Sequence, residues 1–141
     1  MNTDPSHSAD PIADLLRRAK TIAVVGLSTN PLRASHGVAA YLQARGYRII
    51  PVNPAIPEVL GEKAYASVTE IPAGEKIDIV DIFRRPEHVP EIVEQAIRRG
   101  VPAIWMQESV IHEAAAERAR QAGLFVVMDR CILKEHRKRI G

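Results

Sequence analysis

The sequence has few aromatic residues, a single cysteine and no long apolar run. Phe, Trp and Tyr make up 4% of the 141 residues, so the core must be built from aliphatic side chains. The one cysteine, Cys131, excludes an internal disulfide framework. A membrane-spanning helix needs about 18 consecutive apolar residues, and residues 1–10 lack the apolar centre of a signal peptide. We therefore expect a soluble, cytoplasmic protein without a membrane partner.

The chain also has no strong excess of one charge. Nineteen Lys and Arg against seventeen Asp and Glu give a formal net charge of +2, which is too weak to predict nucleic-acid binding. A mild positive excess is compatible with a polyanionic small ligand. The 46% hydrophobic and 26% charged residues are typical of one globular domain. We expect it to span residues 10–141, after a disordered tail, residues 1–9, that has little to bury.

Apolar runs alternate with helix patterns along the chain. Five runs predict strands that are buried on both faces, at 21–26, 47–52, 77–83, 103–106 and 124–128. Helices are predicted at 10–20, 35–46, 86–100, 112–122 and in the tail from 129, with mostly loop at 53–75 and a short helix at 67–71. This alternation indicates an α/β fold, a single doubly wound Rossmann-like domain with a five-stranded, mainly parallel sheet.

The loop after the first predicted strand offers groups that suit a phosphate. Gly26 permits a sharp turn with positive φ, and Arg33 supplies a planar cation. Ser35 is expected to cap the following helix, whose first N–H groups and dipole attract anions. Short hydrogen-bonding side chains come from Ser28, Thr29 and Asn30. Because ligands of doubly wound sheets bind where the strand order reverses, we expect a pyrophosphate cradle here. The alternative is a tight polar loop that only joins a strand to a helix.

The same loop departs from the dinucleotide fingerprint Gly-x-Gly-x-x-Gly. Ser28 and Pro31 occupy the second and third glycine positions, where a side chain hinders the approach of a pyrophosphate and proline removes an N–H. Asn53 follows the second strand in place of the acid that holds the ribose of NAD. These features argue against NAD but leave NADP open. No Gly-Lys-Ser/Thr follows, which excludes a Walker A loop, and no acidic pair follows the first strand, as a receiver domain would require.

Five segments resemble the CoA-binding domain family. They are Ala-Val-Val-Gly-Leu-Ser at 23–28, Val-Asn-Pro at 52–54, Val-Asp-Ile-Phe-Arg-Arg-Pro-Glu at 80–87, Ile-Trp-Met-Gln at 104–107 and Val-Val-Met-Asp-Arg-Cys at 126–131. The family is the stand-alone relative of the N-terminal domain of succinyl-CoA synthetase alpha chains and NDP-forming acyl-CoA synthetases. The resemblance implies a CoA-binding domain over residues 10–141, with coenzyme A or an acyl-CoA as its ligand. The synthetases need a second domain with a phosphorylated histidine, so we expect binding without ligase activity.

The resemblance also implies which residues bind the cofactor. The segment from Ser28 to Pro31 would hold the pyrophosphate, and Asn53 would lie near the 3′-phosphate. Arg84 would contact the nucleotide or the start of the pantetheine arm, unless it and its neighbour form an ion pair with Glu87. With Gly26, the implied set is Gly26, Ser28, Thr29, Asn30, Pro31, Arg33, Ser35, Asn53, Pro54, Phe83, Arg84 and Arg85. All of them lie at the carboxyl ends of predicted strands.

Cys131 raises a second hypothesis. The neighbouring Arg130 can lower the pKa of the thiol, and a mixed disulfide with CoA is then conceivable; the alternative is a structural thiol. Trp105 is expected in the core, and Gln107 is a candidate for contact with a ligand amide. The charge run at 135–139 predicts a solvated helix end or an oligomer contact. We identify no catalytic residue, and no histidine spacing typical of a metal site.

These observations predict a CoA or acyl-CoA binding protein without evident catalytic activity, such as a carrier, sensor or regulatory module. Three alternatives stay open. One is an NADP-dependent oxidoreductase of minimal size, and another is a nucleotide-binding regulatory protein. The third is an interaction protein whose ligand pocket is vestigial. Homo-oligomerisation is compatible with each of them.

Overall fold

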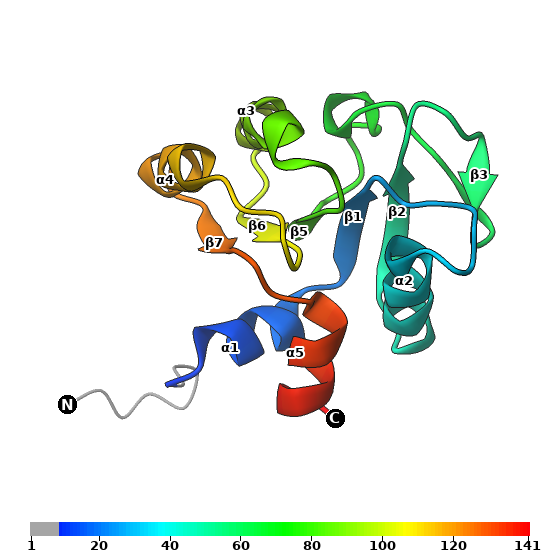
Figure 1. The fold of residues 1–141 in the computed structure, drawn as a ribbon, viewed down its shortest axis with the longest axis horizontal. Coiled ribbons are helices and arrows are strands. Elements are labelled where there is room, and N and C mark those ends of the chain that lie inside the picture. The colour runs from blue at the N-terminus through cyan, green and yellow to red at the C-terminus, as the bar shows by residue number, and fades with distance from the viewer. Residues whose placement is uncertain (1–8) are drawn as a thin grey trace.

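The sheet has five parallel strands in the order β2-β1-β5-β6-β7 (Figure 1). The computed structural model describes residues 9–141, so the predicted disordered tail lies almost wholly outside the described residues. The strands are β1 (Thr21–Val25), β2 (Arg48–Val52), β5 (Ile79–Ile82), β6 (Ala103–Met106) and β7 (Phe125–Val127). The chain runs from β1 outward to β2 and then returns to the other side of β1 for β5. This reversal confirms the doubly wound α/β prediction and places the switch point between β1 and β5.

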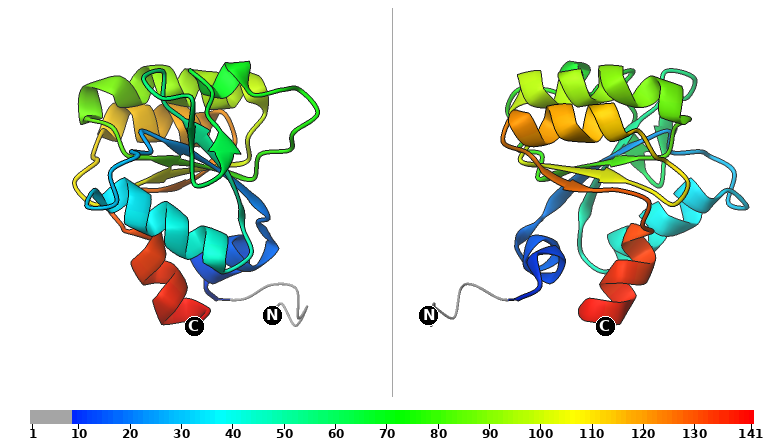
Figure 2. Two further views of the ribbon diagram at one scale, coloured as in Figure 1. Left: turned by 90° about the vertical axis from the view of Figure 1, so that its right-hand side faces the viewer. Right: turned by 60° about the vertical axis from the view of Figure 1, so that its left-hand side comes forward.

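Helices cover both faces of the sheet. α3 (Val89–Arg99) and α4 (Glu113–Gln121) lie on one side, and α1 (Pro11–Arg18), α2 (Ala34–Ala44) and α5 (Ile132–Arg139) on the other (Figure 2). Each layer encloses its own aliphatic core. Successive residues of a strand contact opposite cores, which explains why the strands are mostly apolar rather than alternating, with Asp81 in β5 as a buried exception. Among residues 9–141, no helix combines the length and apolarity needed to cross a bilayer.

Local signals set several of the helix boundaries. The Asp10 carboxylate accepts the N–H of Ala13 at 3.0 Å, and Pro11 occupies the first turn of α1. That hydrogen bond lowers the pKa of the Asp10 carboxyl below its usual value. Gly100 ends α3 in the left-handed conformation, with φ of 75°. These starts and ends agree with the sequence analysis.

Three local predictions differ from the structure. Ser35 does not cap α2; Arg33 occupies the N-cap position, and Ser35 is buried inside the first turn. Pro86 begins a 3₁₀ turn, Pro86–His88, and α3 follows only at Val89. The segment predicted as loop contains a hairpin of β3 (Glu58–Val59) and β4 (Glu62–Lys63), as well as the expected short helix at Val68–Glu70. Two-residue strands are too short to show the alternation that predicts a strand.

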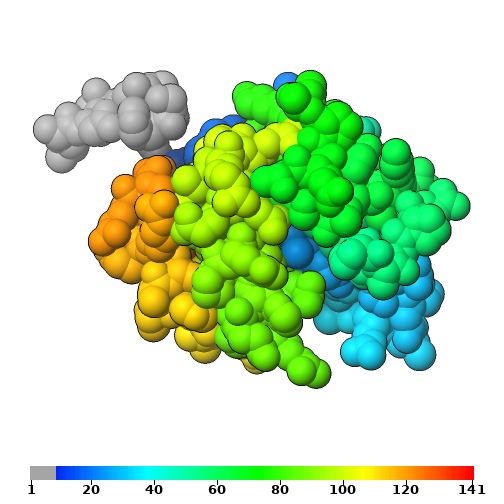
Figure 3. Space-filling view, turned by 90° about the horizontal axis from the view of Figure 1, so that it is seen from above, coloured from blue at the N-terminus to red at the C-terminus, as the bar shows by residue number. Residues whose placement is uncertain are grey.

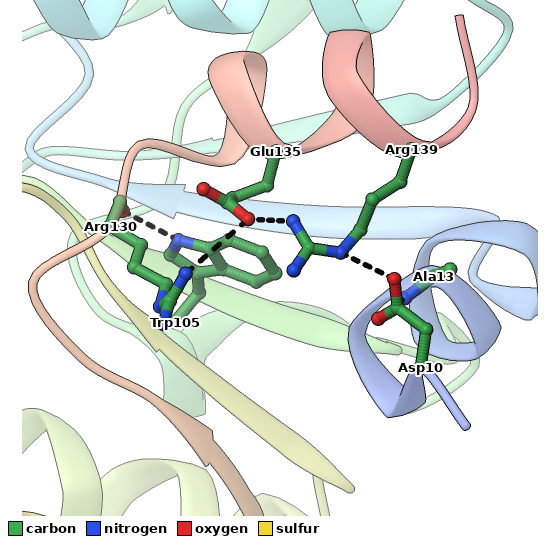
Figure 4. A network of polar contacts seen from close by, with 6 residues as sticks. All are labelled: Asp10, Ala13, Trp105, Arg130, Glu135 and Arg139. Atoms are coloured by element: carbon green, nitrogen blue, oxygen red, sulfur yellow. Dashed lines mark hydrogen bonds and ion pairs between the residues drawn. The ribbon is translucent and has the colours of Figure 1, made fainter.

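The charge run near the C-terminus is held against the body of the protein (Figure 4). The Arg139 guanidinium lies 2.7 Å from the Asp10 carboxylate and also pairs with Glu135. Glu135 in turn lies 3.6 Å from Arg130, whose carbonyl accepts the indole N–H of Trp105 at 2.8 Å. The side chains of Glu135 and Arg139 are only 12% and 17% exposed. The network joins α5 to α1 and β6, so Glu135 and Arg139 are not solvated as the sequence suggested, whereas Arg137 and Lys138 of the same run are exposed.

Candidate functional site

The carboxyl ends of β1, β2 and β5 open into a cavity of about 590 Å³. This volume falls within the roughly 300–1,000 Å³ typical of small-molecule sites. Figure 3 shows blue atoms from the region of β1 at the bottom of a hollow bounded by green and light-blue segments. The lining residues are Gly26, Ser28, Arg33, Ala34, Ser35, Asn53, Pro54, Ala55, Phe83 and Arg84. The cavity therefore lies at the switch point of the sheet.

Eight of the twelve predicted site residues line this cavity. The four that do not are Thr29, Asn30, Pro31 and Arg85, all of which are exposed. Two residues that sequence reasoning missed, Ala34 and Ala55, also line it. An alanine side chain has no polar group that sequence reasoning could single out. These two residues line the cavity because of where their backbone lies.

α2 begins at the cavity without a side-chain cap. Its N-cap residue is Arg33, whose guanidinium has no acceptor atom, and its first turn contains no acidic residue. The backbone N–H groups of Ala34 and Ser35 find no acceptor among residues 9–141. Free N–H groups and the positive end of the helix dipole both favour an anion at this point.

Short side chains hold the loop between β1 and α2 in shape. The N–H of Ser28 donates to the Ser35 hydroxyl, and the N–H of Asn30 donates to the Ser28 hydroxyl, both at 3.0 Å. The N–H of Leu32 donates to the Asn30 side-chain oxygen, also at 3.0 Å. These oxygens therefore order the loop. Ser28 and Ser35 both line the cavity, and each hydroxyl keeps one proton that it can donate.

Asn53 ties the loop after β2 to the loop after β1. Its side-chain amide donates to the carbonyl of Leu27 at 3.0 Å, and its side-chain oxygen accepts the N–H of Ala55 at 2.9 Å. Both ends of the side chain are thus engaged within the protein. Asn53 lines the cavity as predicted, and its observed contacts fix the spacing between two of the cavity walls.

Gly26 is required by the approach of β5. Its φ of +88° lies in the region that favours glycine. A Cβ at this position would collide with the carbonyl oxygen of Phe83 and lie 3.0 Å from Cδ of Arg84. The absent side chain lets the segment after β5 cross the end of β1, which brings Arg84 to the cavity.

Gly26→Ala is expected to destabilise the protein by about 1–3 kcal/mol, the cost of forcing a residue with a Cβ into a strained backbone region. Denaturant unfolding measures the effect. Gly37→Ala is the matched control, because a Cβ at Gly37 meets nothing within 4 Å and alanine favours a helix. We expect that variant to be as stable as the wild type or more so. Equal stability of the Gly26→Ala variant would contradict the close-approach argument.

The charge of the cavity is positive. Arg33 and Arg84 both line it, and no Asp or Glu does. Neither arginine forms an ion pair with another residue of the described chain, and the pair with Glu87 considered from the sequence is not formed. Two guanidinium groups beside an uncapped helix start are an arrangement suited to phosphate oxygens.

Cys131 lies away from the cavity. Its side chain is 8% exposed and packs in the core beside Trp105 and Ile132. Gln107 is also buried, and its side-chain oxygen accepts the N–H of Ile132 at 3.1 Å. The burial of Cys131 favours a structural thiol over the mixed disulfide with CoA.

Trp105 is fully buried, which confirms the prediction that it lies in the core. No group of metal-ligating side chains forms within the described residues.

Comparison with family models and curated proteins gives one consistent result. The model of the CoA binding domain matches residues 20–137. The uncharacterized protein YneT of Bacillus subtilis is 45% identical over 125 residues, which cover 89% of this chain and 91% of that protein. The alpha subunit of the ADP-forming acetate–CoA ligase I of Pyrococcus furiosus is 30% identical over 110 residues. These cover 74% of this chain but only 23% of the ligase subunit, so the chain corresponds to about a quarter of it.

Solved structures give the same picture. A hypothetical protein from Pyrococcus horikoshii superposes with a TM-score of 0.90 at 40% identity, covering 100% of this chain and 99% of that one. The dinucleotide-forming acetyl-coenzyme A synthetase 1 of Ca. Korarchaeum cryptofilum, in complex with phosphate and ADP, superposes with a TM-score of 0.72 at 25% identity. The match covers 83% of this chain and 28% of the synthetase. The protein thus belongs to the CoA-binding domain family.

Proposed function

We propose that this protein binds coenzyme A or an acyl-CoA in the cavity at the carboxyl ends of β1, β2 and β5. The observation that carries the proposal is the uncapped start of α2 beside Arg33 and Arg84. A pyrophosphate in this position would accept the N–H groups of Ala34 and Ser35 and neutralise both guanidinium groups. Each hydrogen bond to a charged group contributes about 1.5–3 kcal/mol.

The remaining lining residues suit the adenosine end of the ligand. Asn53 and Pro54 form the wall on the β2 side, and the neutral Asn53 leaves room for a phosphate on the ribose. Phe83 adds a partly exposed aromatic side chain against which a nucleotide can pack.

A binding role fits the cavity better than a catalytic one. None of the ten lining residues carries a carboxylate, an imidazole or a thiol, the groups that usually act as general acids and bases. We therefore propose a carrier, sensor or regulatory module. The activity of the ligase relatives is not transferred, because the similarity extends over only a part of each of them.

NADP is a second candidate ligand. The neutral Asn53 favours it, because the acid that holds the NAD ribose would repel a 2′-phosphate. The side chain of Ser28 counts against it, since it stands where the dinucleotide fingerprint has glycine.

Thermal unfolding with a panel of CoA, dephospho-CoA and NADPH tests the proposal. A ligand that binds only the folded state adds about 2.7 kcal/mol of stability at a hundredfold excess over its Kd. We expect CoA to raise the melting temperature most and dephospho-CoA to raise it less. Stabilisation by NADPH alone would support the oxidoreductase alternative. No stabilisation by any of the three would support the interaction protein with a vestigial pocket.

A further inference from the structure

One edge of the sheet is an exposed apolar strand. β7 pairs with β6 and with no other strand of the described chain. Residues 124–128 are all apolar, and Leu124, Phe125, Val126 and Met128 are partly exposed. Sheet edges of this kind are templates for pairing with another chain.

The opposite edge is protected. Beside β2, Tyr65 forms a bridge with Val52, and its backbone exchanges hydrogen bonds with Pro51 and Asn53 at 3.0 and 2.8 Å. Proline also removes one N–H from that edge. The protection of one edge and not the other points to β7 as the strand that is left for a partner.

The outward-facing backbone groups of β7 can be assigned. The N–H of Phe125 donates to the carbonyl of Pro102, on the β6 side, at 2.9 Å. Because peptide groups alternate along a strand, Phe125 and Val127 face β6, whereas Val126 and Met128 direct their N–H and C=O groups outward. The N–H of Leu124 is used by α4, since it donates to the carbonyl of Ala119 at 3.0 Å, but the carbonyl of Leu124 is on the outward side.

We propose that β7 pairs with β7 of a second copy of this chain, antiparallel and about a two-fold axis at Val126. In this register the two Val126 residues exchange two hydrogen bonds. Met128 of each copy donates to the Leu124 carbonyl of the other, which adds two more. The edge is therefore complementary to itself, as a two-fold interface requires. The two sheets become one continuous sheet, with the α4 helices of both copies on the same face.

The charges on α4 support a second copy rather than a different partner. α4 packs over β7 at this edge (Figure 1). Its exposed residues Glu113 and Glu117 precede the exposed Arg120. Arg118 is paired with Glu94 of α3 at 2.9 Å, and Arg120 lies 3.9 Å from Glu117 of its own helix. The two-fold axis sets the two α4 helices antiparallel. Glu113 of each copy then lies toward Arg120 of the other, and the two helix dipoles oppose one another.

Sedimentation analysis over a range of concentrations at low ionic strength tests this interface. We expect the wild type to show a monomer–dimer equilibrium. Val126→Pro removes an outward N–H while keeping the ladder with β6, and we expect it to raise the dimer Kd at least tenfold. Circular dichroism and the melting temperature verify that this variant is folded.

An exchange of charges on α4 tests the same interface without altering β7. Glu113→Arg is expected to weaken the dimer, and adding Arg120→Glu to it is expected to restore the dimer. Glu91→Arg is the control, because Glu91 lies on α3 and its side chain is 68% exposed; it should leave the equilibrium unchanged. A wild type that stays monomeric at concentrations approaching millimolar would overturn the proposal. A dimer that neither Val126→Pro nor Glu113→Arg affects would also overturn it, since another surface would then hold the copies together.

Discussion

Replacing both Arg33 and Arg84 with alanine is expected to weaken CoA binding by roughly a hundredfold or more. Both guanidinium groups line the cavity beside the start of α2, and no acidic side chain there offsets them. Loss of two charged hydrogen bonds removes about 3–6 kcal/mol, and every 1.4 kcal/mol corresponds to about a tenfold change in Kd. Calorimetric titration at fixed ionic strength measures the change.

Arg85→Ala is the matched control for this pair of substitutions. Arg85 follows Arg84 directly but is exposed and does not line the cavity. We expect the affinity for CoA to change little in this variant, whereas each single substitution at Arg33 or Arg84 should give part of the double effect. A double variant that retains wild-type affinity would mean that the phosphates bind elsewhere.

Asp81→Asn is expected to remove a destabilisation that grows with pH. Asp81 lies in β5 between Val24 and Trp105 on the neighbouring strands and is completely buried. Neither carboxyl oxygen has a hydrogen-bond partner within the described chain. Burial raises the pKa of the Asp81 carboxyl well above its ordinary value. The folded protein therefore keeps this proton at a pH at which the unfolded chain has released it.

The sign of the effect follows from this difference in proton binding. Above about pH 4 the unfolded chain binds fewer protons at Asp81 than the folded chain, so rising pH favours unfolding. The loss is about 1.4 kcal/mol per pH unit for as long as the folded state keeps the proton. Asparagine has a similar shape but does not titrate.

Unfolding by denaturant between about pH 5 and pH 8 measures the free energy of both proteins. We expect the stability of the Asp81→Asn variant relative to the wild type to increase steadily with pH. The Asp81→Leu variant also lacks the unpartnered polar atoms. Its free energy of unfolding should exceed that of the wild type by the largest margin at high pH. Parallel pH profiles for the wild type and Asp81→Asn would show that Asp81 does not hold its proton in the folded state.

The strands, the helices and the doubly wound fold class could be predicted because the signals for each element are local, whereas the order of the strands was not part of the prediction. The run at 21–26 is mostly aliphatic and ends at Gly26, and the run at 47–52 contains Ile49, Ile50 and Val52. Residues 22–25 and 49–52 are buried. Asp10 and Gly100 mark helix ends through their own side chain or its absence. The β3–β4 hairpin was missed because its strands have two residues each, and its turn at Leu60 and Gly61 is embedded in a proline-rich segment.

The position of the site could also be predicted, but several of the roles could not. The loop after the first strand follows as the site from the doubly wound fold class. Ser35 accepts an N–H from Ser28 instead of capping α2, and this depends on the path of the loop in space. The collision that a Cβ at Gly26 would cause comes from Phe83, which follows β5 and lies far from Gly26 in the sequence. No local pattern reports a contact between segments so far apart in the sequence.

The most direct test of the phosphate cradle is an ¹⁵N–¹H correlation spectrum recorded during titration with CoA. We expect the amide signals of Ala34 and Ser35 to shift most and to saturate, because their free N–H groups gain an acceptor. Signals from the amino ends of the strands should stay in place. If the signals of Ala34 and Ser35 remain unchanged while CoA saturates the protein, the ligand does not bind at the start of α2.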